Sequence, residues 1–462
     1  MAERTQDHTS THARLAERIH GPVHTAVSDA YDELRTGFQL LDPHRPGLVV
    51  EPTGTGDVCA TMETAAQRGM SLAVQATGHG RGEAMRGGVL LNTRRMSSVH
   101  VDPETRTAWV RAGASWQDVL DVATPHGLAP LSGSLAGVGA VSYTLGGGTG
   151  LLARQYGLAA DHVHALEVVT PGGQLRRASP TEGTDLFWAL RGGGGNFGIV
   201  TGMEIALFPV TLIYGGCLFF DLAEAPGVVR NWREWTDTVD EAMTSGMAVV
   251  PFPDVSGVPE AMRGKQVAQL QISYCGSAER GRDLLQPLRE IQPVLRDTVR
   301  EVPYAQSGHV FDEPAQPHGY RGNTVLLDDL DPRTLTMLVS RLGPASPEPR
   351  VLRIRHLGGA LARQPHIPNA VGHRDAAYSL GTLTAGDPAT EDQESFPDRE
   401  LLGLFADHIL GTSLNFSFGP LEHHDIRAAF APADYRRLAR LRAEYDPHGL
   451  LRPNHPIPPI GG

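Results

Sequence analysis

Three dense glycine clusters in the first 200 residues constrain the fold of this chain more than any other feature of its sequence. They are Ala76–Gly80 (ATGHG), Ser132–Gly150 (SGSLAGVGAVSYTLGGGTG) and Arg191–Gly198 (RGGGGNFG). Glycines beside strands let the backbone approach a ligand closely and turn its N–H groups toward an anion. Each cluster alone could be a tight loop. Three together indicate a site for an anionic group such as a diphosphate.

The segments around these clusters predict alternating short strands and helices. Residues 48–52 and 72–78 are apolar runs typical of buried strands. Residues 57–68 between them have helical spacing and end before Gly69, a favourable C-terminal signal. The Pro-Gly-Gly turn at 171–173, between two apolar segments, predicts a hairpin.

After Pro209 the glycine clusters cease and prolines are more evenly spaced. Strand-like segments, among them 214–222 and 351–359, alternate with helical segments, among them 225–243 and 278–291. This order predicts an antiparallel sheet with helices over one face. The fold class predicted for the whole chain is therefore α+β.

Several common cofactors and partners are disfavoured by the sequence. No cluster has the G-x-G-x-x-G register of a dinucleotide-binding strand–turn–helix, and no Gly-Lys-Ser/Thr of a P-loop is present. Lys265 is the only lysine and stands in a polar stretch, which argues against Schiff-base chemistry. The formal net charge of -12 argues against a nucleic acid partner.

The sequence also bears on where the protein works. The first 21 residues are polar and lack the apolar segment of a signal peptide, so we expect disorder or a loosely packed helix there. No apolar run approaches the ~18 residues of a membrane span. The three cysteines, Cys59, Cys217 and Cys275, lack metal-ligand spacing. We expect reduced thiols, no bound metal, a cytoplasmic location, and a monomer or homodimer.

His79 is the unusual member of the first cluster. Because it stands between two glycines, its imidazole is accessible, and a neutral imidazole is nucleophilic. The alternative is that it is simply one of 20 histidines, placed in a polar turn.

Beyond the clusters, the order of several segments resembles one enzyme family. Residues 76–80, 138–150, 154–163, 185–201 and 445–459 have counterparts, in this order, in the berberine-bridge-enzyme-like branch of the vanillyl-alcohol oxidase (PCMH-type) superfamily. These proteins are FAD-linked oxidases. The resemblance covers most of 48–209 and the C-terminal strip, and is patchy between them.

This resemblance implies a two-part FAD-binding domain, residues 41–209 and 411–462, with a substrate-binding domain at 210–410 and a polar segment at 1–40. It implies FAD attached covalently through His79. The implied FAD contacts are Ala76, Thr77, Gly78, His79, Gly80, Ser134, Val138, Gly139, Ser142, Gly146, Gly147, Gly198, Ile199, Val200, Asn415 and Asn454.

The sequence departs from the family pattern at two informative positions. Where members with two covalent links carry their cysteine, this chain has Leu135, so a cysteinyl link is not expected. Where many relatives carry Tyr-x-Asn-Tyr, this chain keeps Asn415 but has Phe416. The usual catalytic tyrosine is therefore missing or relocated.

Four residues are candidates for the catalytic base that this departure leaves open. They are Tyr143, within the second glycine cluster, and Tyr378, His423 and His424. Each has a plain alternative, since Tyr143 could be a packing residue and the histidine pair a surface feature.

The function implied is oxidation of a small-molecule alcohol or amine, or oxidative cyclisation, in secondary metabolism. Val138 resembles the oxygen-permissive residue of plant relatives, which favours O2 as electron acceptor. The alternatives are a dehydrogenase with another acceptor, or a non-redox protein that uses the flavin fold as a scaffold.

Overall fold

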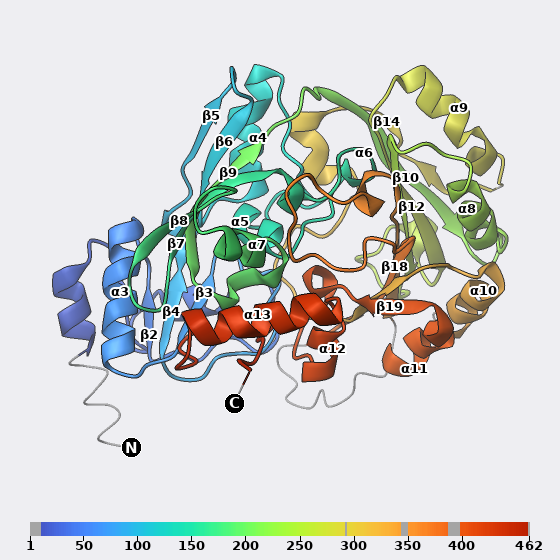
Figure 1. The fold of residues 1–462 in the computed structure, drawn as a ribbon. Coiled ribbons are helices and arrows are strands. Elements are labelled where there is room, and N and C mark those ends of the chain that lie inside the picture. Colours follow the sequence, from blue (N-terminus) through green and yellow to red (C-terminus); the bar gives the residue numbers. More distant parts are fainter. Residues whose placement is uncertain (1–10, 292, 343–349, 387–397, 461–462) are drawn as a thin grey trace.

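The structure is a computed structural model, and it describes residues 11–291, 293–342, 350–386 and 398–460. Two lobes lie side by side (Figure 1). The N-terminal lobe holds two small sheets, and the other lobe holds one sheet of ten strands (the roof sheet). The mixture of helices and antiparallel sheets confirms the predicted α+β class.

The first small sheet has the strand order β1-β2-β4-β3. Strands β2, β4 and β3 are parallel, and α3 lies between β2 and β3 in the chain, as expected for parallel strands that need a crossover. The bounds are β1 Val23–His24, α2 Tyr31–Thr36, β2 Leu48–Val50, α3 Thr55–Gln67, β3 Leu72–Gln75 and β4 Val89–Asn92. A helix at 11–18 packs its Leu15 into the same core.

The second small sheet is antiparallel, in the order β5-β6-β9-β7-β8. The predicted hairpin is confirmed as β7 and β8, joined through Gly173 at φ +76°. Around this sheet pack α4, whose N-cap Ser115 forms a capping box with Asp118, and also α5, α7 and α13. The bounds are β5 Val99–Asp102, β6 Thr107–Arg111, α4 Trp116–Ala123, α5 Ala140–Leu145, α6 Ala153–Tyr156, β7 Val163–Val169, β8 Leu175–Ala178, α7 Thr184–Gly193, β9 Ile199–Ala206, α12 His423–Arg427 and α13 Pro432–Tyr445.

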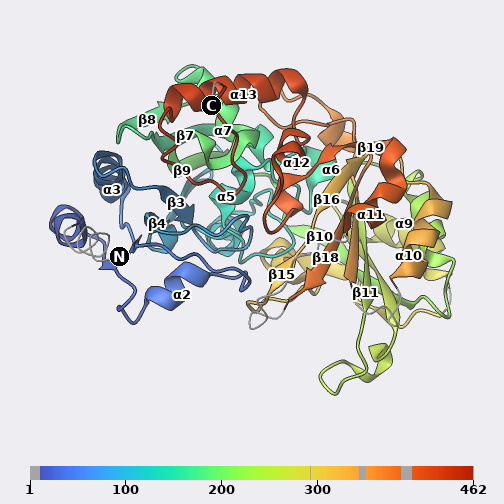
Figure 2. The ribbon, with the colours of Figure 1, turned by 90° about the horizontal axis from the view of Figure 1, so that it is seen from below.

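The roof sheet is antiparallel throughout, with the main order β13-β10-β12-β11-β17-β18-β16-β19. Its outer face carries helices, and its inner face turns toward the N-terminal lobe (Figure 2). The bounds are β10 Leu212–Asp221, α8 Val228–Thr236, β11 Met243–Pro251, β12 Gln266–Tyr274, α9 Ala278–Arg289, β13 Arg296–Asp297, β14 Arg300–Pro303, β15 Tyr320–Arg321, β16 Thr324–Leu327, α10 Pro332–Arg341, β17 Arg350–His356, β18 Tyr378–Ala385, α11 Asp398–Leu402 and β19 Ile409–Thr412.

One predicted helix is shorter than expected. The helical spacing over 225–243 includes Val239 and Met243, yet α8 ends at Thr236. Met243 instead pairs with Tyr274 at the start of β11, where it is fully buried. Tertiary pairing therefore overrides the local apolar period at this end of the helix.

Candidate active site

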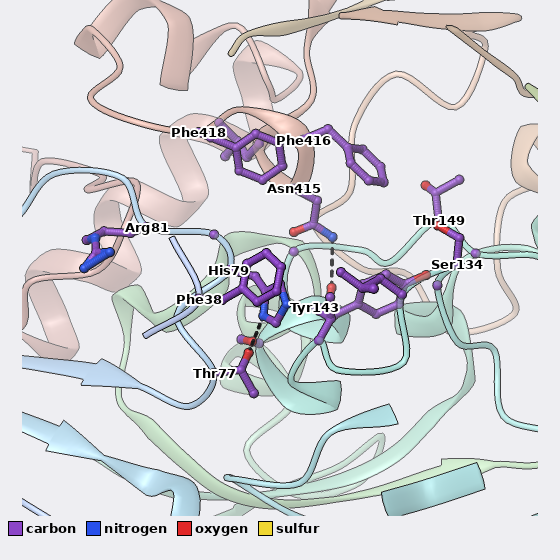
Figure 3. Close-up of a pocket in the computed structure, with 18 of the residues that line it drawn as sticks. Phe38, Thr77, His79, Arg81, Ser134, Tyr143, Thr149, Asn415, Phe416 and Phe418 are labelled. Carbon is purple, nitrogen blue, oxygen red and sulfur yellow. Dashed lines mark hydrogen bonds between the residues drawn. The ribbon is translucent and has the colours of Figure 1, made fainter. Parts of the chain in front are cut away.

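A cavity of about 830 Å³ lies where the two lobes meet (Figure 3). All three glycine clusters line it on the side of the N-terminal lobe, and the inner face of the roof sheet lines it on the other. The C-terminal strip contributes residues 451–455. The volume falls in the range of about 300–1,000 Å³ that is typical of pockets for cofactors and small molecules.

The glycine clusters shape the floor of this cavity. At Gly80, Gly194 and Gly195 a Cβ atom would meet no atom of a described residue within 4 Å other than its chain neighbours, so these lining positions leave open space beside the backbone. At Gly146 the reverse holds, because a Cβ atom there would lie 1.8 Å from Oδ1 of Asn415. The clusters thus form an open cradle whose second loop fits tightly against the C-terminal part of the chain.

His79 lies in this cradle, stacked on the ring of Phe38 with a centroid distance of 3.9 Å (Figure 3). Its Nδ1 is 2.8 Å from Oγ1 of Thr77, whereas its buried Nε2 has no hydrogen-bond partner in the described part of the chain. Burial, with His318 nearby, lowers the pKa of His79 to about 4. The imidazole is therefore neutral at physiological pH.

Thr77 and Asn415 join the first two clusters to each other and to the C-terminal part of the chain. The backbone N–H of Gly139 donates to Oγ1 of Thr77 over 3.2 Å. Nδ2 of Asn415 donates to the carbonyl oxygen of Tyr143 over 2.9 Å. Asn454 likewise donates to the carbonyl oxygen of Gly80 over 2.6 Å. Segments far apart in sequence therefore fix the cradle.

Tyr143 lines the cavity but is enclosed by the glycine loop. Its ring packs edge-on against Trp116 with a centroid distance of 5.4 Å, and a Cβ atom at Gly148 would lie 2.5 Å from it. Its buried hydroxyl has no hydrogen-bond partner among the described residues, and burial raises its pKa well above the ordinary value. This environment suits a packing residue that keeps its proton.

Most residues expected to contact FAD line the cavity. Gly139 and Gly147 do not: Gly139 bonds to Thr77, and Gly147 lines a small adjacent cavity. The lining residues from the expected set are Ala76, Thr77, Gly78, His79, Gly80, Ser134, Val138, Ser142, Gly146, Gly198, Ile199, Val200, Asn415 and Asn454.

Three of the four candidate bases lie elsewhere. Tyr378 is buried under the helices of the roof sheet, where its hydroxyl is 2.6 Å from Oγ1 of Thr236. His423 is exposed, with Nε2 at 2.6 Å from the hydroxyl of Tyr435. His424 is exposed beside Asp425. The structure does not bring these three side chains to the cavity.

The cavity also contains charged side chains that the sequence analysis did not single out. Arg353 and Arg355 on β17 line it, as does Glu313 from the loop before β15. Oε2 of Glu313 accepts a short hydrogen bond from Oγ of Ser134. A signal for the arginines exists in the alternation Leu352-Arg353-Ile354-Arg355, which predicts one apolar and one cationic strand face. No comparable signal marks Glu313.

Leu135 lines the cavity, and none of the three cysteines does. Val138 also lines it and accepts a backbone hydrogen bond from Trp116. Among the described residues, no group of histidines, cysteines and carboxylates could hold a metal ion. Within that part of the chain, every helix is too short or too polar to cross a bilayer.

Comparison with known proteins agrees with this geometry. The family described as "FAD binding domain" matches residues 46–179, which contain the first two glycine clusters. The chain is 28% identical over 462 residues to (R)-6-hydroxynicotine oxidase of Paenarthrobacter nicotinovorans, covering 96% of this chain and 98% of the relative.

Solved structures share the whole fold. Xylooligosaccharide oxidase from Myceliophthora thermophila C1, in complex with xylobiose, superposes with a TM-score of 0.84 at 22% identity, covering 98% of this chain and all of the other. Glucooligosaccharide oxidase from Acremonium strictum, described with 6-S-cysteinyl, 8α-N1-histidyl FAD, has a TM-score of 0.83 at 20% identity, with coverage of 98% and 100%.

Proposed function

Since this chain belongs to the FAD-linked oxidoreductases, we propose that it is an oxidase acting on a small-molecule alcohol or amine, with O2 as electron acceptor. The observation that carries this proposal is the cavity, in which the glycine cradle faces the polar inner surface of the roof sheet. Cofactor and substrate would thus meet between the lobes, where ligand sites commonly lie.

The residues present fit FAD. The open positions at Gly80, Gly194 and Gly195 leave room for the cofactor beside the backbone, and His79 offers a ring nitrogen that has no hydrogen-bond partner among the described residues. When bound, FAD would supply a hydride acceptor for the substrate and a two-electron donor for O2, with two protons completing hydrogen peroxide. The chain itself must bind and orient the substrate and remove a proton from it.

We propose a single covalent link, through the imidazole of His79. Its lowered pKa keeps the ring neutral, which is the nucleophilic form. We propose no cysteinyl link of the kind described for glucooligosaccharide oxidase, because Leu135 stands where the family resemblance places that cysteine and none of the three cysteines lines the cavity.

For the base we propose Glu313 in preference to Tyr143. A carboxylate in the cavity can take the proton of a substrate hydroxyl or ammonium group while the hydride leaves the adjacent carbon. Ser134 orients Glu313 through its hydrogen bond. Tyr143, whose raised pKa and enclosure favour the protonated form, contributes to packing.

The test is an absorbance spectrum of the purified protein before and after acid precipitation. Yellow colour in the pellet, lost from the pellet in His79→Ala, is the expected result. Colour released into the supernatant of the unaltered protein would remove the covalent link but keep the flavoprotein. Hydrogen peroxide formed during turnover in air supports O2 as acceptor, and turnover only with an added quinone or dye would contradict it.

A further inference from the structure

The inner face of the roof sheet carries two arginines at the cavity. Along β17, Val351, Arg353 and Arg355 line the cavity, whereas Leu352 and Ile354 between them are 0% and 1% exposed and pack under the helices. Because side chains alternate between the faces of a strand, this register directs both guanidinium groups toward the space between the lobes.

Arg353 has no hydrogen-bond partner for its Nε and Nη2 atoms, both of which are buried, and it forms no ion pair with a described residue. Its guanidinium lies over the ring of Phe418, 5.4 Å from the centroid. Burial and the neighbouring Arg355 lower the pKa of Arg353 to about 10, so it stays charged at neutral pH. A buried charge left without hydrogen bonds costs free energy unless a ligand completes its surroundings.

Arg355 reinforces the charge. Its guanidinium lies over the ring of Phe416, 3.7 Å from the centroid. Phe416 has no hydroxyl group, so this contact adds packing without adding a hydrogen-bond acceptor for Arg355. Stacking on an aromatic ring leaves the in-plane N–H groups of a guanidinium free to bind an acceptor.

The carboxylates nearby do not balance these two charges. Glu313 faces both arginines and is the carboxylate whose charge acts on each of them. Asp312 also lines the cavity, but it pairs with Arg296 over 3.2 Å. On the roof-sheet side of the cavity, Arg353 and Arg355 thus face one carboxylate that has no ion pair among the described residues, so this side carries a net positive charge that would attract an anionic group of a ligand.

We propose that the substrate is an alcohol or amine that also bears a carboxylate, and that Arg353 binds this carboxylate with Arg355 beside it. The planar fork of a guanidinium matches a carboxylate with two parallel hydrogen bonds. A substrate whose only charge is an ammonium group would be repelled. This inference rests on the proposed function of the same cavity, and it narrows the substrate class.

Calorimetric titration of the flavin-loaded protein tests the proposal without requiring turnover. The probes are benzoate, its neutral isostere benzamide, benzylamine and phenyl phosphate. Benzoate should bind at least about tenfold more tightly than benzamide, since one charge-assisted pair is worth more than about 1.4 kcal/mol. Benzylamine should bind more weakly than benzamide.

Arg353→Gln should weaken benzoate binding by at least about tenfold and leave benzamide binding unchanged. The matched control is Arg230→Gln, at an exposed arginine of α8 on the outer face, which should change neither affinity. Flavin content, read from absorbance, should be the same in all three proteins.

Equal affinity for benzoate and benzamide would overturn the proposal, and so would tighter binding of phenyl phosphate than of benzoate. Loss of flavin in Arg353→Gln would assign the arginine to the cofactor and also overturn it. Failure of the oxidase proposal is separate: selective benzoate binding without hydrogen peroxide formation in turnover would leave the carboxylate site intact and remove O2 as acceptor.

Discussion

Substitution of a single residue, Glu313, distinguishes best between the two possible catalytic bases, Glu313 and Tyr143. Glu313 is half-buried, bonded to Ser134, and faces the cavity arginines. We expect Glu313→Gln to lower kcat by about 10²–10⁴-fold, since this is the usual contribution of a general base. Asp312→Asn is the matched control, because the Asp312 carboxylate is already paired with Arg296. The kcat of this variant should change little.

The measurement is steady-state oxidation at several substrate concentrations, with flavin content checked in each variant. If the kcat of Glu313→Gln lies within about threefold of that of the unaltered enzyme, Glu313 is not the general base, because loss of a general base lowers kcat far more than this. In that case the kcat of Tyr143→Phe should be measured next, because Tyr143 is the one of the four candidate bases named in the sequence analysis that lines the cavity.

At the scale of the element, the glycine loops separate two roles that the sequence alone could not divide. The glycine clusters predict that the backbone closely approaches another group, but they do not indicate whether that group is protein or a ligand. Gly146 faces protein, with Oδ1 of Asn415 at 1.8 Å from a hypothetical Cβ, whereas Gly195 faces open space in the cavity. The first position is required by packing, whereas the second leaves room beside the backbone that a ligand could fill.

This division leads to a paired prediction. Gly146→Ala must displace Asn415 from its bond to Tyr143, so the free energy of unfolding should fall by about 1–3 kcal/mol. The φ angle of Gly195 is -77°, which alanine adopts readily, so the Gly195→Ala protein should fold normally. Its added methyl group would occupy space in the cavity, so this variant should retain less FAD. Urea denaturation of each protein as purified, with its flavin content measured by absorbance, checks both. Equal stability of Gly146→Ala and the original protein would contradict the packing assigned to Asn415.

The elements also show where sequence reasoning ends. The hairpin at 171–173 and the α+β class followed from local turn residues and apolar periods. The end of α8 did not, because Met243 has both the spacing of a helix and a partner in Tyr274. Arg353 and Arg355 could have been found from their alternation with Leu352 and Ile354. What that strand face meets depends on pairing across the whole sheet.

At the scale of the whole molecule, the site exists because residues from distant parts of the chain converge. Tyr320 in the roof sheet donates to the carbonyl oxygen of His79 over 2.6 Å. Arg374 and Asp161 form a buried ion pair between the lobes over 2.6 Å. Glu313 reaches the cavity only through such convergence, since its loop has no motif. This explains why the glycine side of the cavity could be predicted from the sequence and the roof-sheet side could not.

Burial also gives the whole molecule a pH dependence. His44 and His356 have pKa values lowered to about 3, and His455 and His79 to about 4, chiefly by burial. In the unfolded chain these groups titrate near the ordinary value of about 6.5. The unfolded state therefore binds more protons below that pH, and the free energy of unfolding falls as the pH falls from about 6.5 toward 4.

His44 allows this effect to be measured on one residue. It is 4% exposed, and its Nδ1 accepts from the backbone N–H of Met85. A histidine that stays neutral in the fold lowers the free energy of unfolding by roughly 2 kcal/mol between pH 6.5 and 5. Glutamine keeps a hydrogen-bond acceptor but does not titrate. In His44→Gln the free energy of unfolding should therefore fall less over this pH range, by up to about that amount. His126→Gln, at an exposed histidine, should leave the decline unchanged. Urea denaturation at pH 7.5, 6.5 and 5 measures all three proteins. Parallel declines in the original protein and in His44→Gln would mean that His44 is protonated without unfolding, and so that its surroundings admit water.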